Sequence, residues 1–102
     1  MALDSAAFND LRNFIKRRVG FVKYRIENSY YQTMITDATV LPTGIVRVQA
    51  SIVPAKQKAT IDRVELHNIN GELWAHQDVS ITIDQGQTGV LYWFDFTIKE
   101  GT

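Results

Sequence analysis

Three side chains in the middle of the chain could together bind a metal ion or move protons: Glu65, His67 and His76. Both histidines of the sequence lie in the stretch HNINGELWAH, which runs from His67 to His76 around Asn70-Gly71. Two imidazoles and one carboxylate are a donor set that Zn²⁺ accepts, provided that the fold brings them to one surface. The first question is therefore whether this stretch is a site or only a turn.

The Asn70-Gly71 pair predicts a β-hairpin, because a type I′ turn needs positive φ at both central residues and these two residue types tolerate it. A two-residue loop pairs Ile69 with Glu72, Asn68 with Leu73, His67 with Trp74, Leu66 with Ala75, and Glu65 with His76. Val64, Leu66, Leu73 and Ala75 then face the core, and Glu65, His67, Trp74 and His76 face the other way.

An open sheet face beside a turn offers neither the shelter nor the supporting hydrogen bonds of a catalytic zinc site. Stacking of His67 on Trp74 and pairing of Glu65 with His76 are sufficient reasons for these residue types. We therefore predict a turn, with no catalytic residue, no metal and no cofactor. A small metal-dependent enzyme that uses Glu65, His67 and His76 is kept as a third hypothesis.

Other chemical motifs are scarce. The glycine-rich stretch DQGQTG, from Asp84 to Gly89, joins two predicted strands and lacks the lysine and following helix of a phosphate-binding loop. The chain has no cysteine, which excludes disulfides, thiolate metal sites and a cysteine nucleophile. An enzyme is not the expected class.

The elements that position these residues begin with an amphipathic helix over about residues 5–19. Its apolar residues recur at steps of three and four, namely Phe8, Leu11, Phe14, Ile15 and Val19. Lys16, Arg17 and Arg18 lie at the end of the helix that favours cations, and Gly20 is expected to stop the helix in a left-handed conformation.

From about residue 20 to residue 100 the pattern has a period of two. Val22, Tyr24 and Ile26 share one face of the first strand, and Val46, Val48, Ala50 and Ile52 share one face of a later one. The strand near Gln77-Asp78 is expected to be broken or to contain a bulge. Six or seven strands at hairpin spacing predict a mainly β fold, either an antiparallel, Ig-like β-sandwich or a small barrel, in a single domain of residues 1–102.

Composition agrees with one soluble domain: 102 residues, 45% hydrophobic, with eleven basic and eleven acidic side chains. A formal charge of zero gives no general attraction to nucleic acid, and no window is apolar enough for membrane insertion. The N-terminus lacks the pattern of a signal peptide.

The last strand carries a second apolar face. Val90, Tyr92, Phe94, Phe96 and Ile98 alternate with Leu91 and Trp93, which must be covered by the helix or by a partner. Large aromatic side chains are favoured in protein interfaces, so Trp74, Leu91 and Trp93 are the candidate interface residues.

Three stretches follow one another along the chain: FNDLRNFIKRRVGFVKYRIENSYY, IDRVELHNINGELWAH and TGVLYWFDFTIKE. Through these stretches the sequence resembles, over nearly the whole chain, small tail-region proteins of phages and of phage-derived tail-like particles of Gram-positive bacteria. The matching positions are Ile61, Val64, Glu65, Leu66, Asn70, Gly71, Gly89 to Tyr92, Phe94, Ile98, Lys99 and Glu100. The resemblance implies a non-enzymatic subunit of a tail or baseplate, present in several copies.

The first hypothesis is accordingly a structural subunit that assembles with copies of itself and with other tail or baseplate proteins. It would be made in the cytoplasm of the host bacterium and would reside in the virion or tail-like particle. The alternative is a monomeric carbohydrate- or ligand-binding β-module that uses Trp74 or Trp93 as a stacking platform.

Overall fold

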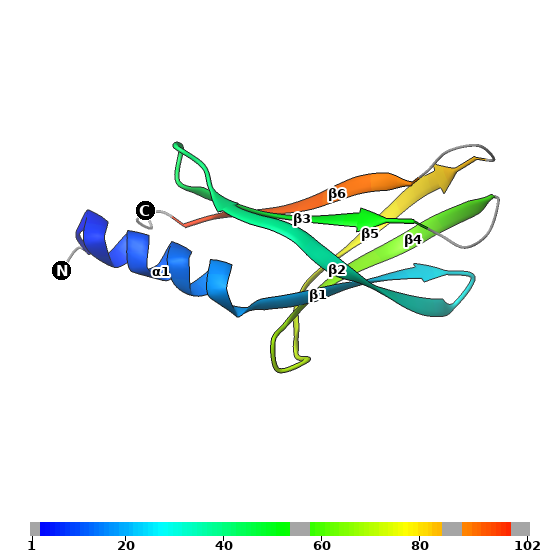
Figure 1. The fold of residues 1–102 in the computed structure, drawn as a ribbon, viewed down its shortest axis with the longest axis horizontal. Helices are drawn as coiled ribbons and strands as arrows, with labels where there is room; N and C mark the ends of the chain where they lie inside the picture. Colours follow the sequence, from blue (N-terminus) through cyan, green and yellow to red (C-terminus); the bar gives the residue numbers. More distant parts are fainter. Residues whose placement is uncertain (1–2, 54–57, 85–88, 99–102) are drawn as a thin grey trace.

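The computed structural model describes residues 3–53, 58–84 and 89–98. The described part of the chain is mainly β, with 65% of its residues in strands, and it forms one helix followed by six antiparallel strands in a nearly closed, barrel-like sheet (Figure 1). Of the two predicted architectures, the small barrel is the nearer one, although the sheet is not fully closed. Residues 85–88 of the predicted loop Asp84–Gly89 lie outside the described residues, as do residues 54–57 and the predicted matching positions Lys99 and Glu100.

The elements follow one another with short connections. They are α1 (Ser5–Arg18), β1 (Val19–Ile26), β2 (Ser29–Val40), β3 (Ile45–Ile52), β4 (Ala59–Asn68), β5 (Leu73–Ile83) and β6 (Val90–Thr97). In the sheet their order is β5-β4-β1-β2-β3-β6. The molecule is elongated, 53 × 26 × 24 Å, and α1 extends from one end of its long axis (Figure 1).

Strand β2 changes partner half-way along its length. Residues 29–34 pair with β1 and residues 35–40 pair with β3, with a register shift between Ile35 and Asp37. This change lets one long strand bend the sheet around a shared core. The two end strands are bridged by a side-chain hydrogen bond, in which Tyr92 Oη of β6 donates to Gln77 Oε1 of β5 at 2.6 Å.

The core confirms the predicted alternation. Val22, Tyr24 and Ile26 of β1 and Val46, Val48, Ala50 and Ile52 of β3 are all buried, as is Phe94 of β6. Val90, Tyr92 and Phe96 pack against the same core. The predicted bulge in β5 is also present, because the pairing shifts between Arg63–Asp78 and Ile61–Ile81.

Gly20 has a different role from the one expected at the end of the helix. Gly20 is not left-handed; it lies in β1, where a Cβ atom would come 2.4 Å from the carbonyl oxygen of Asn68. Glycine is needed there because two backbones approach closely. The amide of Ile69 also donates to the carbonyl oxygen of Arg18 at 2.8 Å, so the β4–β5 hairpin is attached to the end of α1.

Candidate functional site

The β4–β5 turn has a different geometry from the predicted type I′ turn. Gly71 has φ of +80°, but Asn70 does not have positive φ. The amide of Gly71 donates to the carbonyl oxygen of Asn68 at 3.0 Å, and the amide of Asn68 donates to that of Glu72 at 2.9 Å. The loop is therefore three residues long, with glycine in the left-handed position after the first turn.

Asn68 determines this loop, and the sequence reasoning missed it. Its Oδ1 accepts hydrogen bonds from the amides of Asn70 and Glu72, both at 2.9 Å, and its Nδ2 donates to Glu72 Oε1 at 3.0 Å. An asparagine side chain that bonds the backbone two residues on offers an alternative to the type I′ turn. The available signal was the first asparagine of the sequence NING.

The extra loop residue changes the pairing only locally. His67 pairs with Leu73 instead of Trp74, and a bulge then restores the predicted pairs Leu66–Ala75 and Glu65–His76. Leu73 is exposed, so its predicted place in the core was wrong. A shift of one residue moves a side chain to the other face of the sheet, which is the reason for this error.

Glu65 and His67 are buried, at 8% and 7% exposure, so the prediction of an open face at this position was also wrong. His67 stacks on Phe21 of β1, with ring centroids 5.0 Å apart and an angle of 8° between the planes. Lys23 Nζ lies 5.8 Å from the centroid of the Phe21 ring. The neighbouring strand β1, and not Trp74, supplies the stacking partner.

A chain of polar contacts runs along this outer face of β4. Arg63 Nε donates to Glu65 Oε2 at 2.7 Å, and His67 Nε2 lies 3.0 Å from Glu65 Oε1. The other ring nitrogen, Nδ1, lies 3.3 Å from the carbonyl oxygen of Gly71. Both ring nitrogens face oxygen atoms, so only the protonated imidazole can donate to both.

Two opposing effects determine the pKa of Glu65. Burial by itself raises the pKa, but the hydrogen bonds from His67 and Arg63 outweigh it and leave the pKa below its ordinary value of 4.5. The carboxylate is thus held ionised between two donors. The carboxylate holds the side chains of Arg63 and His67 in line along β4, with one of these partners at each of its oxygens.

The predicted zinc-capable trio is not assembled as a metal site. His76 is opposite Glu65 in the register but is exposed, whereas Glu65 and His67 are buried and bonded to each other. Within residues 3–53, 58–84 and 89–98, no group of three or more histidine, cysteine, aspartate or glutamate side chains is arranged to hold a metal ion.

The three predicted interface residues lie in different surroundings. Leu91 and Trp93 of β6 are 54% and 45% exposed with α1 in place, whereas Trp74 is only half-buried beside the bulge of β5. The helix therefore does not cover the β6 pair. It packs instead beside β2 and β3, and Arg12 Nη2 donates to the carbonyl oxygen of Ile98, the residue that follows β6, at 2.7 Å.

Trp93 belongs to a small ordered cluster. The guanidinium of Arg47 lies 4.9 Å from the centroid of its ring. Arg47 also makes two hydrogen bonds of 2.9 Å to the carboxylate of Asp95, which lower the pKa of Asp95. A planar cation that is fixed by two hydrogen bonds to a carboxylate is well placed to hold the indole in one orientation.

Comparison with known proteins gives no family for this chain. No family model matches it, and neither a curated protein nor a solved structure matches it. Among the residues that the structure describes, no helix is long and apolar enough to span a membrane.

Proposed function

We propose that this protein is a non-enzymatic structural subunit of a phage tail, baseplate or phage-derived tail-like particle, and that it acts by protein–protein assembly. The observation that carries the proposal is the exposure of Leu91 and Trp93 on an end strand of the sheet. The resemblance of the sequence to tail-region proteins supplies the kind of particle. Copies of the chain and other tail or baseplate proteins are the proposed partners.

The cluster around Trp93 has the composition of an interface hot spot. Tryptophan and arginine are the residue types that most often dominate binding energy, and Arg47 is already oriented by Asp95 before any partner arrives. Pre-ordering of the side chains lowers the entropy lost on association. Burial of the indole and of Leu91 by a neighbouring subunit would supply the apolar contribution.

Strand β6 adds a second means of contact. It pairs with β3 on one side, and on the other side the hydrogen bond from Tyr92 to Gln77 joins it to β5 without any backbone pairing among the described residues. An end strand offers backbone amide and carbonyl groups that a neighbouring chain can pair with, and a defined partner prevents uncontrolled pairing. An assembly contact at β6 would combine this edge with Leu91 and Trp93.

The first test of this proposal measures association of the purified chain by light scattering over a concentration series. Trp93→Lys should weaken association and leave the circular dichroism spectrum unchanged. Gln32→Lys is the matched control, because it adds the same charge at an exposed position of β2, away from β6. Equal association of both variants and the wild type would contradict an interface at Trp93.

The second test addresses the particle itself. Quantitative mass spectrometry of tail or tail-like particles purified from the native bacterium should find this chain in several copies per particle. Its absence from intact particles, with normal amounts in the soluble cell fraction, would contradict the proposed function.

The alternative, a carbohydrate-binding module, makes a different prediction for the same residue. A stacked sugar would shift the tryptophan fluorescence in a glycan titration. Arg47 already lies over the ring of Trp93, so a sugar could use only the opposite ring face. Saturable binding of a glycan, lost in Trp93→Lys, would favour the alternative over assembly.

A further inference from the structure

The β4–β5 loop contains a residue pair that is chemically labile, an asparagine followed by a glycine. Asparagine is a thermolabile residue type, and its side chain deamidates most readily when glycine follows it. Of the five asparagines in the sequence, only Asn70 precedes a glycine. Both Asn70 and Gly71 are exposed, and no atom lies within 4 Å of the position that a Cβ atom of Gly71 would take. No side chain at residue 71 therefore hinders a reaction between Asn70 and the backbone that follows it.

The reaction at such a pair joins the two residues in a ring. The backbone nitrogen of Gly71 loses its proton and attacks Cγ of Asn70, so that a C–N bond forms and the side-chain nitrogen leaves as ammonia. The resulting succinimide ring then adds one water molecule at either of its two carbonyl carbons and opens. The products are aspartate and isoaspartate at position 70, and each carries a carboxylate that asparagine lacks.

The folded loop opposes the first step of this reaction. The amide of Gly71, which supplies the attacking nitrogen, donates to the carbonyl oxygen of Asn68 at 3.0 Å. The carbonyl oxygen of Gly71 lies 3.3 Å from His67 Nδ1. The peptide groups on both sides of Gly71 are thus held in place. Its nitrogen can reach Cγ of Asn70 only when the loop opens locally.

The side chain of Asn68 keeps the loop in its closed state. Its Oδ1 accepts hydrogen bonds from the amides of Asn70 and Glu72, both at 2.9 Å, and its Nδ2 donates to Glu72 Oε1 at 3.0 Å. Asn68 is only 3% exposed, so these bonds are sheltered from competition by water. We call these three hydrogen bonds the Asn68 clamp.

We propose that Asn70 is a site of deamidation and that the Asn68 clamp sets the rate of this modification. The ring cannot form while the clamp holds the backbone on both sides of Gly71. The rate therefore depends on local opening of the loop and not on unfolding of the barrel. This inference goes beyond the proposed function and does not rest on it.

Mass spectrometry of peptides, after long incubation at mildly alkaline pH, follows conversion at each asparagine. The folded wild type should convert slowly and at Asn70 before any other asparagine. In urea, the same chain should convert at Asn70 at least about tenfold faster, because denaturation removes the closed loop. Equal rates in the folded and the denatured chain would overturn the proposal, since the Asn68 clamp exists only in the folded chain.

Asn68→Ala tests the clamp in the folded state. This variant should convert at Asn70 at least about tenfold faster than the folded wild type, because the loop loses three hydrogen bonds. Val48→Ala is the matched control, since it lowers the stability of the whole fold through a buried residue of β3, away from the loop. The two variants are compared at equal distances below their melting temperatures. Equal rates in both would show that global unfolding controls the reaction, and would overturn the proposal.

Exchange of donor and acceptor gives a variant that restores the clamp. When Asn68→Asp is combined with Glu72→Gln, the carboxylate can accept from the same two amides and the side-chain amide at residue 72 can donate in return. The double variant should convert at Asn70 as slowly as the wild type. Conversion as fast as in Asn68→Ala would show that the hydrogen bonds of residue 68 do not set the rate.

Discussion

The ring of His67 lies flat on the ring of Phe21, which belongs to the adjacent strand β1, and the two planes differ by only 8°. The contact covers a side chain whose two nitrogens are directed at Glu65 and at the backbone of Gly71. One residue thus ties β1, β4 and the β4–β5 loop together. This arrangement gives His67 a structural role that its exposed counterpart His76 lacks.

Replacement of the two histidines should therefore have unequal effects. His67→Ala should lower the free energy of unfolding by about 2 kcal/mol, because it removes the stacked ring and leaves Glu65 with one donor fewer. His76→Ala should change it by no more than about 0.5 kcal/mol, as expected for an exposed position. Urea denaturation of both variants measures the difference; equal effects would contradict the structural role of His67.

The lowered pKa of Glu65 predicts loss of stability in acid. Because the folded-state pKa lies below 4.5, the ionised carboxylate stabilises the fold above that pH, and the contribution is lost as the pH falls from about 4.5 through the folded-state pKa. Glu65→Gln should flatten this part of the curve of melting temperature against pH. Asp37→Asn, a change at an exposed carboxylate bonded to Thr39, serves as the control. An unchanged slope in Glu65→Gln would contradict the assignment.

Replacement by alanine should destabilise the protein much more at Gly20 than at Gly71. Gly20→Ala should destabilise the protein by about 3 kcal/mol or more, because the new Cβ atom would collide with the carbonyl group of Asn68 and force two strands apart. Gly71→Ala should cost about 1 kcal/mol, since its φ is +80° but the space around it is open. Thermal denaturation ranks the two, and the reverse order would show that the backbones do not touch at Gly20.

Replacement of two adjacent residues of β6 should have different effects, one on the stability of the fold and the other on assembly. Phe94→Ala should lower the free energy of unfolding by about 3–4 kcal/mol, because Phe94 is buried against Tyr92 in an edge-to-face contact with ring centroids 5.1 Å apart. Trp93→Ser should cost about 1 kcal/mol or less and chiefly affect association. A strongly unfolded Trp93→Ser variant would place the indole in the core instead.

Alternation of apolar residues was sufficient to predict the mainly β fold, the N-terminal helix and most of the core. Strands with a period of two have one buried face, and a segment such as Ile45–Ile52 can satisfy that rule in only one way. The predicted pairs Leu66–Ala75 and Glu65–His76 are correct, although the two-residue turn from which they were counted is not. The extra residue of the loop and the bulge beside Trp74 shift the pairing in opposite directions, so the two errors cancel.

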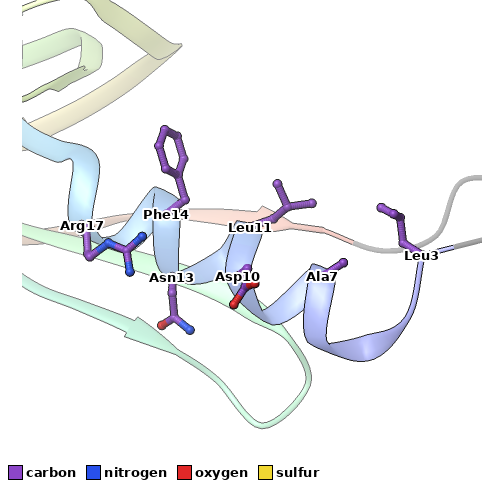
Figure 2. A pocket seen from close by; sticks show the side chains of 7 residues that line it. All are labelled: Leu3, Ala7, Asp10, Leu11, Asn13, Phe14 and Arg17. Atoms are coloured by element: carbon purple, nitrogen blue, oxygen red, sulfur yellow. The ribbon is translucent and has the colours of Figure 1, made fainter.

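Tertiary structure alone decided what covers each face. His67 was predicted to stack on Trp74, but Phe21 is distant in sequence and becomes its neighbour only because β1 lies between β4 and β2. Gly20 is required by the backbone of Asn68, a contact that no local pattern specifies. Leu11 and Phe14 stay exposed (Figure 2) because α1 packs beside β2 and β3 by one side only, so a helix whose sequence predicts burial finds only part of its apolar surface covered by its own chain.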